Sequence, residues 1–231
     1  MALKNYKPTS PGQRGLVLVD KSSLWKGRPE KTLTKGLTKN GGRNNLGRIT
    51  VRHQGGGAKR LYREIDFKRT KIGMNATVER IEYDPNRSCY IMLVKFEDNS
   101  HAYYLAPQKI KIGDKIENGS KKEIKIGNCM PLQDIPVGID IHNVEIQPGA
   151  GGKIARAAGS SVTITGVDGN YTIIKMSSSE VRKIDSRCMA TIGVLSNPDQ
   201  KNIKIGKAGR SSCSSRRRHT RGVVKNPVDH P

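Results

Sequence analysis

Hydrophobic and polar positions alternate in short runs along the middle of the chain, a pattern typical of half-buried β-strands. The first group comprises KRLYREIDF, ATVERIEYD, the more continuously apolar SCYIMLVKFED, and HAYYLAPQ. Turn-forming residues such as those of YDPNRS and KIGDKIENG separate or follow these runs. Several short strands at this spacing predict a small antiparallel barrel.

A second group of β-type runs extends from about residue 128 to 195. It comprises PVGIDIHNVEI, SSVTITGVDGNYTIIKM and MATIGVLSN, which are rich in β-branched residues and separated by Gly or Asp-Gly. The stretch VDGNY predicts a hairpin turn. We therefore expect an all-β fold whose two halves pack together. Their cores should be small, because aromatic residues make up only 4% of the chain.

Neither end of the sequence shows the alternation of a β-strand or the 3.6-residue period of an amphipathic helix. Proline and glycine interrupt the first 47 residues too often for a helix, and RSSCSSRRRHTRG near the other end is equally irregular. Such segments bury too little surface to offset their ordering entropy, so we expect them to fold against a partner. The predicted organisation is a basic N-terminal extension (1–47), a first barrel (48–125), a second all-β segment (126–196) and a basic C-terminal extension (197–231).

Charge follows the same division. The net charge is +22, and residues 1–60 hold 14 Lys and Arg against 2 acidic residues, residues 61–200 hold 19 against 17, and residues 201–231 hold 9 against 1. A nearly neutral body with basic ends predicts binding to a polyanion, foremost nucleic acid. A merely solvated surface is the alternative, and a membrane-surface role is disfavoured because neither end has an amphipathic helical pattern.

Two glycine-rich motifs carry candidate chemistry. In GRITVRHQGGGAKRLYR, cations surround three consecutive glycines, which predicts close approach of the backbone to a phosphate or sugar. A plain flexible loop is the alternative. The second motif, QPGAGGKIARAAG, has Gln147 and Ile154 where a nucleotide-binding loop needs Gly and Ser or Thr, so an NTPase is unsupported. It is expected to present Lys153 and Arg156 to phosphate, with a simple β-turn as the alternative.

The remaining residues give little support for an enzyme. The histidines have no metal-ligand spacing, and the four cysteines form no CxxC pair, so we expect no metal site and reduced, mainly structural thiols. A Cys–His nucleophile with partners distant in sequence stays open. No run is apolar enough to span a membrane, and no secretory or transit pattern opens the sequence, so we expect a soluble chain that acts where it is made.

Several blocks of the sequence resemble one family in order along nearly the whole chain. They include SLWKGRPEKTLTKGLTKNGGRNNLGRITVRHQGGGAKRLYREIDFKR, PVGIDIHNVE, GGKIARAAGSS, ATIGVLSNPDQKNIKIGKAGR and RGVVKNPVDHP. These resemble the bacterial-type ribosomal protein L2 family of the large subunit. The resemblance implies an oligonucleotide-binding (OB) barrel followed by an SH3-like barrel, with basic extensions that penetrate ribosomal RNA.

The implied function is structural. The chain would bind large-subunit rRNA, support association with the small subunit and help to shape the peptidyl-transferase region without carrying out the chemistry. Its partners would be rRNA, neighbouring ribosomal proteins and the small subunit, and Mg²⁺ that accompanies rRNA is the only ion expected, with no cofactor. A free OB-fold RNA chaperone or translation-factor-like module is the alternative, although such folds usually expose more stacking aromatics.

The candidate RNA-binding residues are the cations and glycines of these blocks and the residues of the terminal loop. They are Arg43, Arg48, Arg52, His53, Gly55, Gly56, Gly57, Lys59, Arg60, Arg63, Lys68, Arg69, Arg87, Lys153, Arg156, Lys207, Arg210, Arg216, Arg217, Arg218, Arg221, Asn226, Asp229 and His230.

Three departures from the family pattern qualify the resemblance. In the first glycine-rich block, Gln54 stands where the family usually has a basic residue, and Ala58 stands where it usually has a histidine. Further along, SSCSSRRRHT stands where the family has an apolar, Trp-containing segment. After the final His-Pro, the family continues with a second histidine, a glycine run and a long basic tail. We expect that the sequence is part of a longer chain or that a separate polypeptide supplies this tail. The expected location is the mitochondrial matrix, with the bacterial cytoplasm as the alternative.

Overall fold

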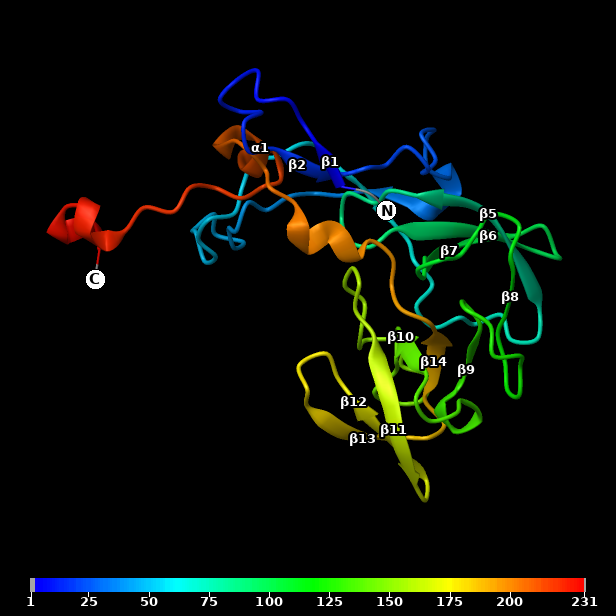
Figure 1. Cartoon of the computed structure of the whole chain (residues 1–231). Helices are drawn as coiled ribbons and strands as arrows, with labels where there is room; N and C mark the ends of the chain where they lie inside the picture. The colour runs from blue at the N-terminus through cyan, green and yellow to red at the C-terminus, as the bar shows by residue number, and fades with distance from the viewer. Residues whose placement is uncertain (1–2, 231) are drawn as a thin grey trace. The chain divides into compact units, whose positions relative to one another are not determined.

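The computed structural model describes residues 3–230 and consists mainly of β-strands and connecting loops (Figure 1). Contacts group these residues into two compact units. We call residues 20–35 and 62–201 the barrel unit, and residues 3–19, 36–61 and 202–230 the basic unit. The chain passes between the units at residues 19–20 and 201–202 and within two short strands, β3 (Thr34–Gly36) and β4 (Leu61–Arg63).

The first sheet of the barrel unit is antiparallel, in the order β7-β6-β5-β8. Its strands are β5 (Asn75–Glu82), β6 (Ile91–Phe96), β7 (His101–Leu105) and β8 (Lys115–Glu117). Alternate residues of β5 face inward, so Val78 packs with Met92 and Tyr104 in one buried cluster. A register shift between Val78 and Arg80 bends β5, as a β-bulge does.

The second sheet of the barrel unit has the order β13-β12-β11-β10-β14-β9. Its strands are β9 (Cys129–Pro131), β10 (Asp140–His142), β11 (Val162–Asp168), β12 (Tyr171–Lys175), β13 (Val181–Asp185) and β14 (Met189–Ile192). Ile141, Ile164 and Ile174 lie at the centre of its core and are fully buried. The predicted hairpin at VDGNY is confirmed, with Gly169 in the left-handed region (φ +58°).

The all-β prediction is confirmed, but some elements differ from expectation. KRLYREIDF forms a strand only at its centre, because the Asp66 carboxylate accepts N–H groups of Lys68 and Arg69 and starts a turn. β13 was missed, since most of its side chains are exposed and the strand lies at the sheet edge, where charge is common.

Part of the predicted N-terminal extension packs on the first sheet without any partner. Leu24 is buried in the first core, and the Trp25 N–H donates to the Ile81 carbonyl at 2.9 Å. The Glu30 N–H donates to the Tyr103 hydroxyl at 2.8 Å. One apolar anchor and these hydrogen bonds order residues 20–35, although their Gly and Pro content predicted an unfolded segment.

The basic unit contains little regular structure. β1 (Leu3–Asn5) pairs antiparallel with β2 (Val17–Val19), and reciprocal backbone hydrogen bonds of 3.0 Å join Val17 to Lys204. A helix of six residues, α1 (Ala208–Cys213), follows, with short 3₁₀ turns η4 (Gly222–Val224) and η5 (Pro227–Asp229). No pattern of apolar residues predicts α1, since a helix this short shows no complete apolar period.

Within residues 3–230, no helix is both long and apolar enough to cross a membrane.

One glycine of the second barrel is required by packing. A Cβ atom at Gly152 would come within 2.4 Å of the Asn143 carbonyl oxygen and 2.3 Å of its Oδ1. Gly152→Ala should lower the free energy of unfolding by about 1–3 kcal/mol or more, measured by chemical denaturation. Gly166→Ala is the matched control, because the nearest atom to its added Cβ is 4.0 Å away, and it should change stability by less than about 1 kcal/mol. Equal losses in both variants would contradict this packing.

A buried histidine makes the second barrel sensitive to acid. His142 is fully buried, its Nδ1 bonds the Gly193 carbonyl at 2.6 Å, and burial lowers its pKa to about 3. The unfolded chain, with an ordinary histidine pKa near 6.5, binds the proton first as pH falls. This one group should therefore cost about 1.4 kcal/mol of stability per pH unit below about pH 6.5. Thermal melts between pH 6.5 and 5 should show a smaller slope for His142→Gln; an unchanged slope would contradict the assignment.

Candidate nucleic-acid interface

The basic unit concentrates positive charge. Its residues include 17 Lys and Arg and a single acidic residue, Asp229, whereas the barrel unit holds 25 Lys and Arg and 19 acidic residues. Like charges gathered at this density repel one another and attract polyanions. Charge therefore points to the basic unit as the main surface for nucleic acid.

Two segments far apart in sequence lie side by side within this unit. Residues 53–58 run antiparallel to residues 213–218, with hydrogen bonds from the Gly55 N–H to the Ser215 carbonyl (3.2 Å), from Ala58 to Cys213 (3.0 Å) and from Arg217 to His53 (2.9 Å). We call these two segments the paired strip. The strip joins the predicted first RNA-binding block to the arginine-rich segment near the other end.

Contacts from side chains reinforce the paired strip. His53 has a positive φ of 61°, its Nδ1 lies 3.1 Å from the Arg218 carbonyl oxygen, and its ring lies 4.5 Å from that of His219 between centroids. Lys39 donates to the carbonyl oxygens of Gly56 and Ala58. The strip is thus fixed by both backbone and side-chain bonds.

The three consecutive glycines play different roles. A Cβ at Gly57 would lie 2.3 Å from the Ser215 Oγ, and one at Gly55 would lie 2.9 Å from the Arg217 Nε. These two glycines therefore allow the strip to pair closely. Gly56 has φ +65° and no atom within 4 Å of a built Cβ, so of the three it alone leaves space for a ligand where a side chain would be. Its carbonyl oxygen accepts from Lys39 Nζ (3.3 Å) and Ser215 Oγ (3.2 Å).

Two open grooves lie along the paired strip and share Arg52, His53 and Gln54. The first has a volume of about 550 Å³, and its cations are Lys39, Arg52, Arg60 and Arg216. The second has a volume of about 430 Å³, and its charged residues are Arg43, Arg52, Arg217, Arg218, Lys225 and Asp229. Guanidinium groups suit phosphate because their N–H donors match its oxygens in pairs.

The other candidates of the basic unit lie around these grooves or elsewhere on its surface. The side chains of Arg48, Lys59, Lys207, Arg221 and Asn226 are exposed. Arg210 is partly buried near the end of α1, and His230 packs against Gly222, 3.7 Å from a Cβ built there. Contact of these residues with RNA stays a prediction.

A second basic cluster surrounds Phe67 in the barrel unit. The Arg156 guanidinium lies 4.6 Å from the Phe67 ring centroid and that of Arg87 5.8 Å from it. Lys68 and Lys153 are exposed beside them, and the Gly152 N–H donates to the Phe67 carbonyl at 3.0 Å. We call these residues the Phe67 cluster; it joins predicted site residues from both barrels.

Two predicted site residues are structural instead. Arg63 is buried and its Nη1 lies 3.4 Å from Oδ1 of Asp84, a fully buried carboxylate. Arg69 is also buried, donates to the Asn118 Oδ1 (3.2 Å) and lies over the Tyr104 ring at 3.9 Å. Neither guanidinium is presented at the surface, because a buried charge needs internal partners. Arg87 belongs to the Phe67 cluster and also has a structural role, since its Nε donates to Asp84 at 2.6 Å.

The loop around QPGAGG binds an internal carboxylate. Glu145 is buried and accepts the N–H groups of Gly149 (3.2 Å), Gly151 (2.8 Å) and Met189 (3.0 Å). Donors that a nucleotide-binding loop would offer to phosphate are therefore occupied, in agreement with the failed motif. Lys153 and Arg156 are exposed, as the sequence predicted, although the Arg156 Nη1 also donates to the Gly152 carbonyl at 3.3 Å.

Other reactive groups fit a structural role. Among residues 3–230, no group of three or more His, Cys, Asp or Glu side chains is placed to hold a metal ion. Cys89, Cys129 and Cys188 are free and buried, and burial raises the pKa of Cys89 and Cys188 to about 11. These three thiols stay protonated, as expected for structural cysteines; Cys213 is free and exposed.

Sequence reasoning missed several residues of this surface. Lys39, Ser215, His219, Thr220 and Lys225 line the grooves or brace the strip. Lys39 and Lys225 could have been chosen by charge, but no pattern in the sequence announces that residues 53–58 and 213–218 meet.

Comparison with known proteins places both parts of the chain in one family. Residues 30–118 match the family model "Ribosomal Proteins L2, RNA binding N-terminal domain", and residues 125–231 match "Ribosomal Proteins L2, C-terminal domain". The chain is 72% identical to large ribosomal subunit protein uL2 of Pelagibacter ubique and 60% identical to that of Paracoccus denitrificans, covering the whole chain and 83% of each relative. The uL2 protein of Rickettsia bellii is also 60% identical, with 85% of its length covered.

These domains correspond to the OB-fold and SH3-like barrels that the sequence predicted, and they match the two sheets of the barrel unit. Both family models and full-length relatives therefore agree, and the chain belongs to the ribosomal protein L2 family.

Proposed function

We propose that the chain is a structural constituent of the large ribosomal subunit that binds large-subunit rRNA. The observation that carries this proposal is the paired strip, which gathers cations from two distant segments beside two grooves. Membership of a family whose N-terminal domain is described as RNA-binding supports it. The barrel unit would act as the scaffold and the basic unit as the main contact with phosphate.

The proposed mechanism is electrostatic and geometric. Arg52, Arg216 and Arg217 offer donors for phosphate pairs, and the open backbone of Gly56 allows close approach of a sugar or phosphate. Neutralising phosphates releases counterions and supplies affinity without base readout. We assign no catalysis to the chain, because its role is to hold RNA in position.

The finer assignments are also proposals. Neighbouring ribosomal proteins and the small subunit are the expected protein partners, and support of the peptidyl-transferase region is the expected effect on translation. The three relatives named above are bacterial, which favours the bacterial cytoplasm over the mitochondrial matrix first expected. A separate polypeptide that carries the family's tail stays a prediction.

The paired strip should dominate the salt dependence of RNA binding. Replacing Arg216, Arg217 and Arg218 together by Gln should lower the slope of log affinity against log salt by roughly 2–3, since each phosphate contact contributes about 0.7–0.9. Fluorescence anisotropy with one labelled stem–loop RNA over a salt series measures this slope.

The matched control removes the same charge from the barrel unit. Arg182, Lys183 and Arg187 are exposed, but each is paired with a carboxylate, of Glu180, Asp168 and Asp185 respectively. Their joint replacement by Gln should leave the slope nearly unchanged, because these cations are already neutralised. Equal effects of the two triple variants would show that total charge, and not the strip, determines binding.

The chain should also be found in ribosomal particles. In a sucrose gradient of lysate from cells that express a tagged copy, we expect the tag to sediment with large subunits, because an RNA scaffold is stable as part of its assembly. The alternative of a free RNA chaperone predicts a persistent low-mass pool and no tag in large subunits, and that result would overturn the proposal.

A further inference from the structure

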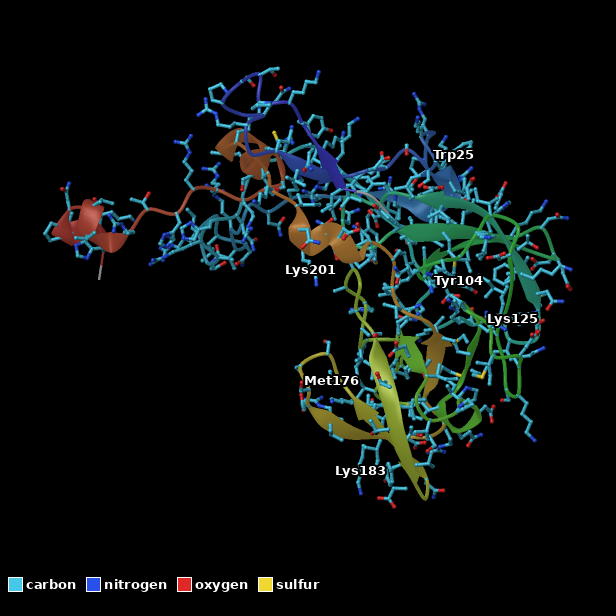
Figure 2. The ribbon with its side chains drawn as sticks, viewed as in Figure 1. Trp25, Tyr104, Lys125, Met176, Lys183 and Lys201 are labelled. Atoms are coloured by element: carbon cyan, nitrogen blue, oxygen red, sulfur yellow. The ribbon has the colours of Figure 1, made fainter. Side chains whose placement is uncertain are left out.

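Trp25 is the single tryptophan of the chain and half of its side chain is exposed (50%). Figure 2 labels it on the segment of the barrel unit that precedes β3. The segment is firmly anchored, because Leu24 lies in the first core and the backbone N–H of Trp25 donates to the Ile81 carbonyl at 2.9 Å. A large apolar ring is thus held in a fixed place at the surface without being needed in the core.

Neighbouring groups fix the orientation of the indole. Gly27 supports it closely, because a Cβ there would come within 2.6–2.7 Å of three ring atoms. The Arg80 guanidinium lies 5.1 Å from the ring centroid, and Arg80 is itself held by Glu82 through an Nε–Oε1 contact of 2.7 Å. The ring therefore loses little conformational freedom when a ligand binds, which favours affinity.

The indole lines an open groove of about 500 Å³. Ile81 and Ile112 contribute apolar surface to it, and Arg80, which also lines it, is ion-paired with Glu82 and Glu30. Four further cations, Lys21, Lys26, Arg28 and Lys31, are exposed along the same segment. An aromatic ring in an apolar groove, flanked by cations, is the chemistry that accommodates a nucleobase and its phosphates.

We propose that Trp25 is a stacking platform for an unpaired base of the RNA that the chain binds. This inference rests on the proposed RNA-binding function and adds a contact outside the paired strip and the Phe67 cluster. Bases within a duplex are covered on both faces by their neighbours, so only an unpaired base can place a face on the ring. The platform selects for single-stranded RNA and tolerates any base, because every base has a π-face.

Tyr83 in the same unit does not offer an equivalent surface. The Lys21 ammonium lies 3.3 Å from the centroid of the Tyr83 ring, whereas the Arg80 guanidinium lies 5.1 Å from that of Trp25, so a cation covers the Tyr83 ring more closely. Burial lowers the pKa of this lysine, as expected for an ammonium that rests against apolar surface. Trp25 is therefore the better-placed exposed aromatic of this region.

The single tryptophan gives the test a built-in reporter. Trp25 emission of the full chain is titrated at low salt with a single-stranded oligoadenylate and, separately, with an RNA duplex of equal length, while anisotropy of the labelled RNAs follows binding. At saturation with each RNA, the single strand should quench the emission strongly and the duplex should not. Binding of both RNAs with equal quenching, or with none, would overturn the platform.

Variants then separate stacking from general RNA binding. Trp25→Leu should weaken binding of the oligoadenylate by about 5- to 100-fold, because leucine keeps only apolar bulk. Trp25→Phe should retain most of the affinity, because phenylalanine keeps an aromatic face on which a base can stack. Tyr171→Ala removes an equally exposed aromatic (52%) from β12 and should leave the affinity unchanged. Thermal melts check that all three variants remain folded.

The outcome also distinguishes this inference from the function on which it rests. If Trp25→Leu binds the oligoadenylate as tightly as the original chain, the platform is wrong, while steeply salt-dependent binding would still support the proposed function. If neither RNA binds at low salt, the proposed function itself fails.

Discussion

The charge of the basic unit is the constraint on which the rest of the structure depends. Two unit charges 7 Å apart in water repel by about 0.6 kcal/mol, and the unit holds 17 cations against one acidic residue. The backbone bonds of the paired strip, such as those from Gly55 to Ser215 and from Arg217 to His53, hold these cations together against repulsion. A polyanion relieves that repulsion, so bound RNA and the fold of this unit stabilise each other.

The barrel unit is stabilised by apolar cores and buried ion pairs and does not depend on a polyanion. Its two sheets have small apolar cores and internal polar networks, in which Asp84 pairs with Arg63 and Glu145 accepts three backbone N–H groups. In these networks buried charges stabilise the fold by bonding to internal partners. An arginine with a buried partner, such as Arg63, is therefore structural, whereas an arginine without one stays at the surface. The Phe67 cluster lies at the boundary between the roles, since Arg87 serves both Asp84 and the Phe67 ring.

The sequence predicted the parts of the structure that depend on local pattern. The apolar runs predicted β5, β6, β7 and the β11–β12 hairpin. Binding of polyanions by the two basic ends, inferred from the charge distribution, stays a prediction. Pairing between distant segments could not be predicted, because no pattern in residues 53–58 (HQGGGA) indicates that they pair with residues 213–218 (CSSRRR). The buried arginines were misjudged for the same reason: Arg63 and Arg69 look like Arg60 in the sequence, and only the position of Asp84 or Tyr104 in space separates them.

The paired strip itself is the central claim, and amide hydrogen exchange of the free chain tests it most directly. If residues 53–58 and 213–218 form one ladder, the amides of Gly55, Ala58 and Arg217 should exchange at a common rate, well below that of unstructured amides. Exchange of these three amides at the rate of an unstructured chain, with no shared protection, would contradict the account.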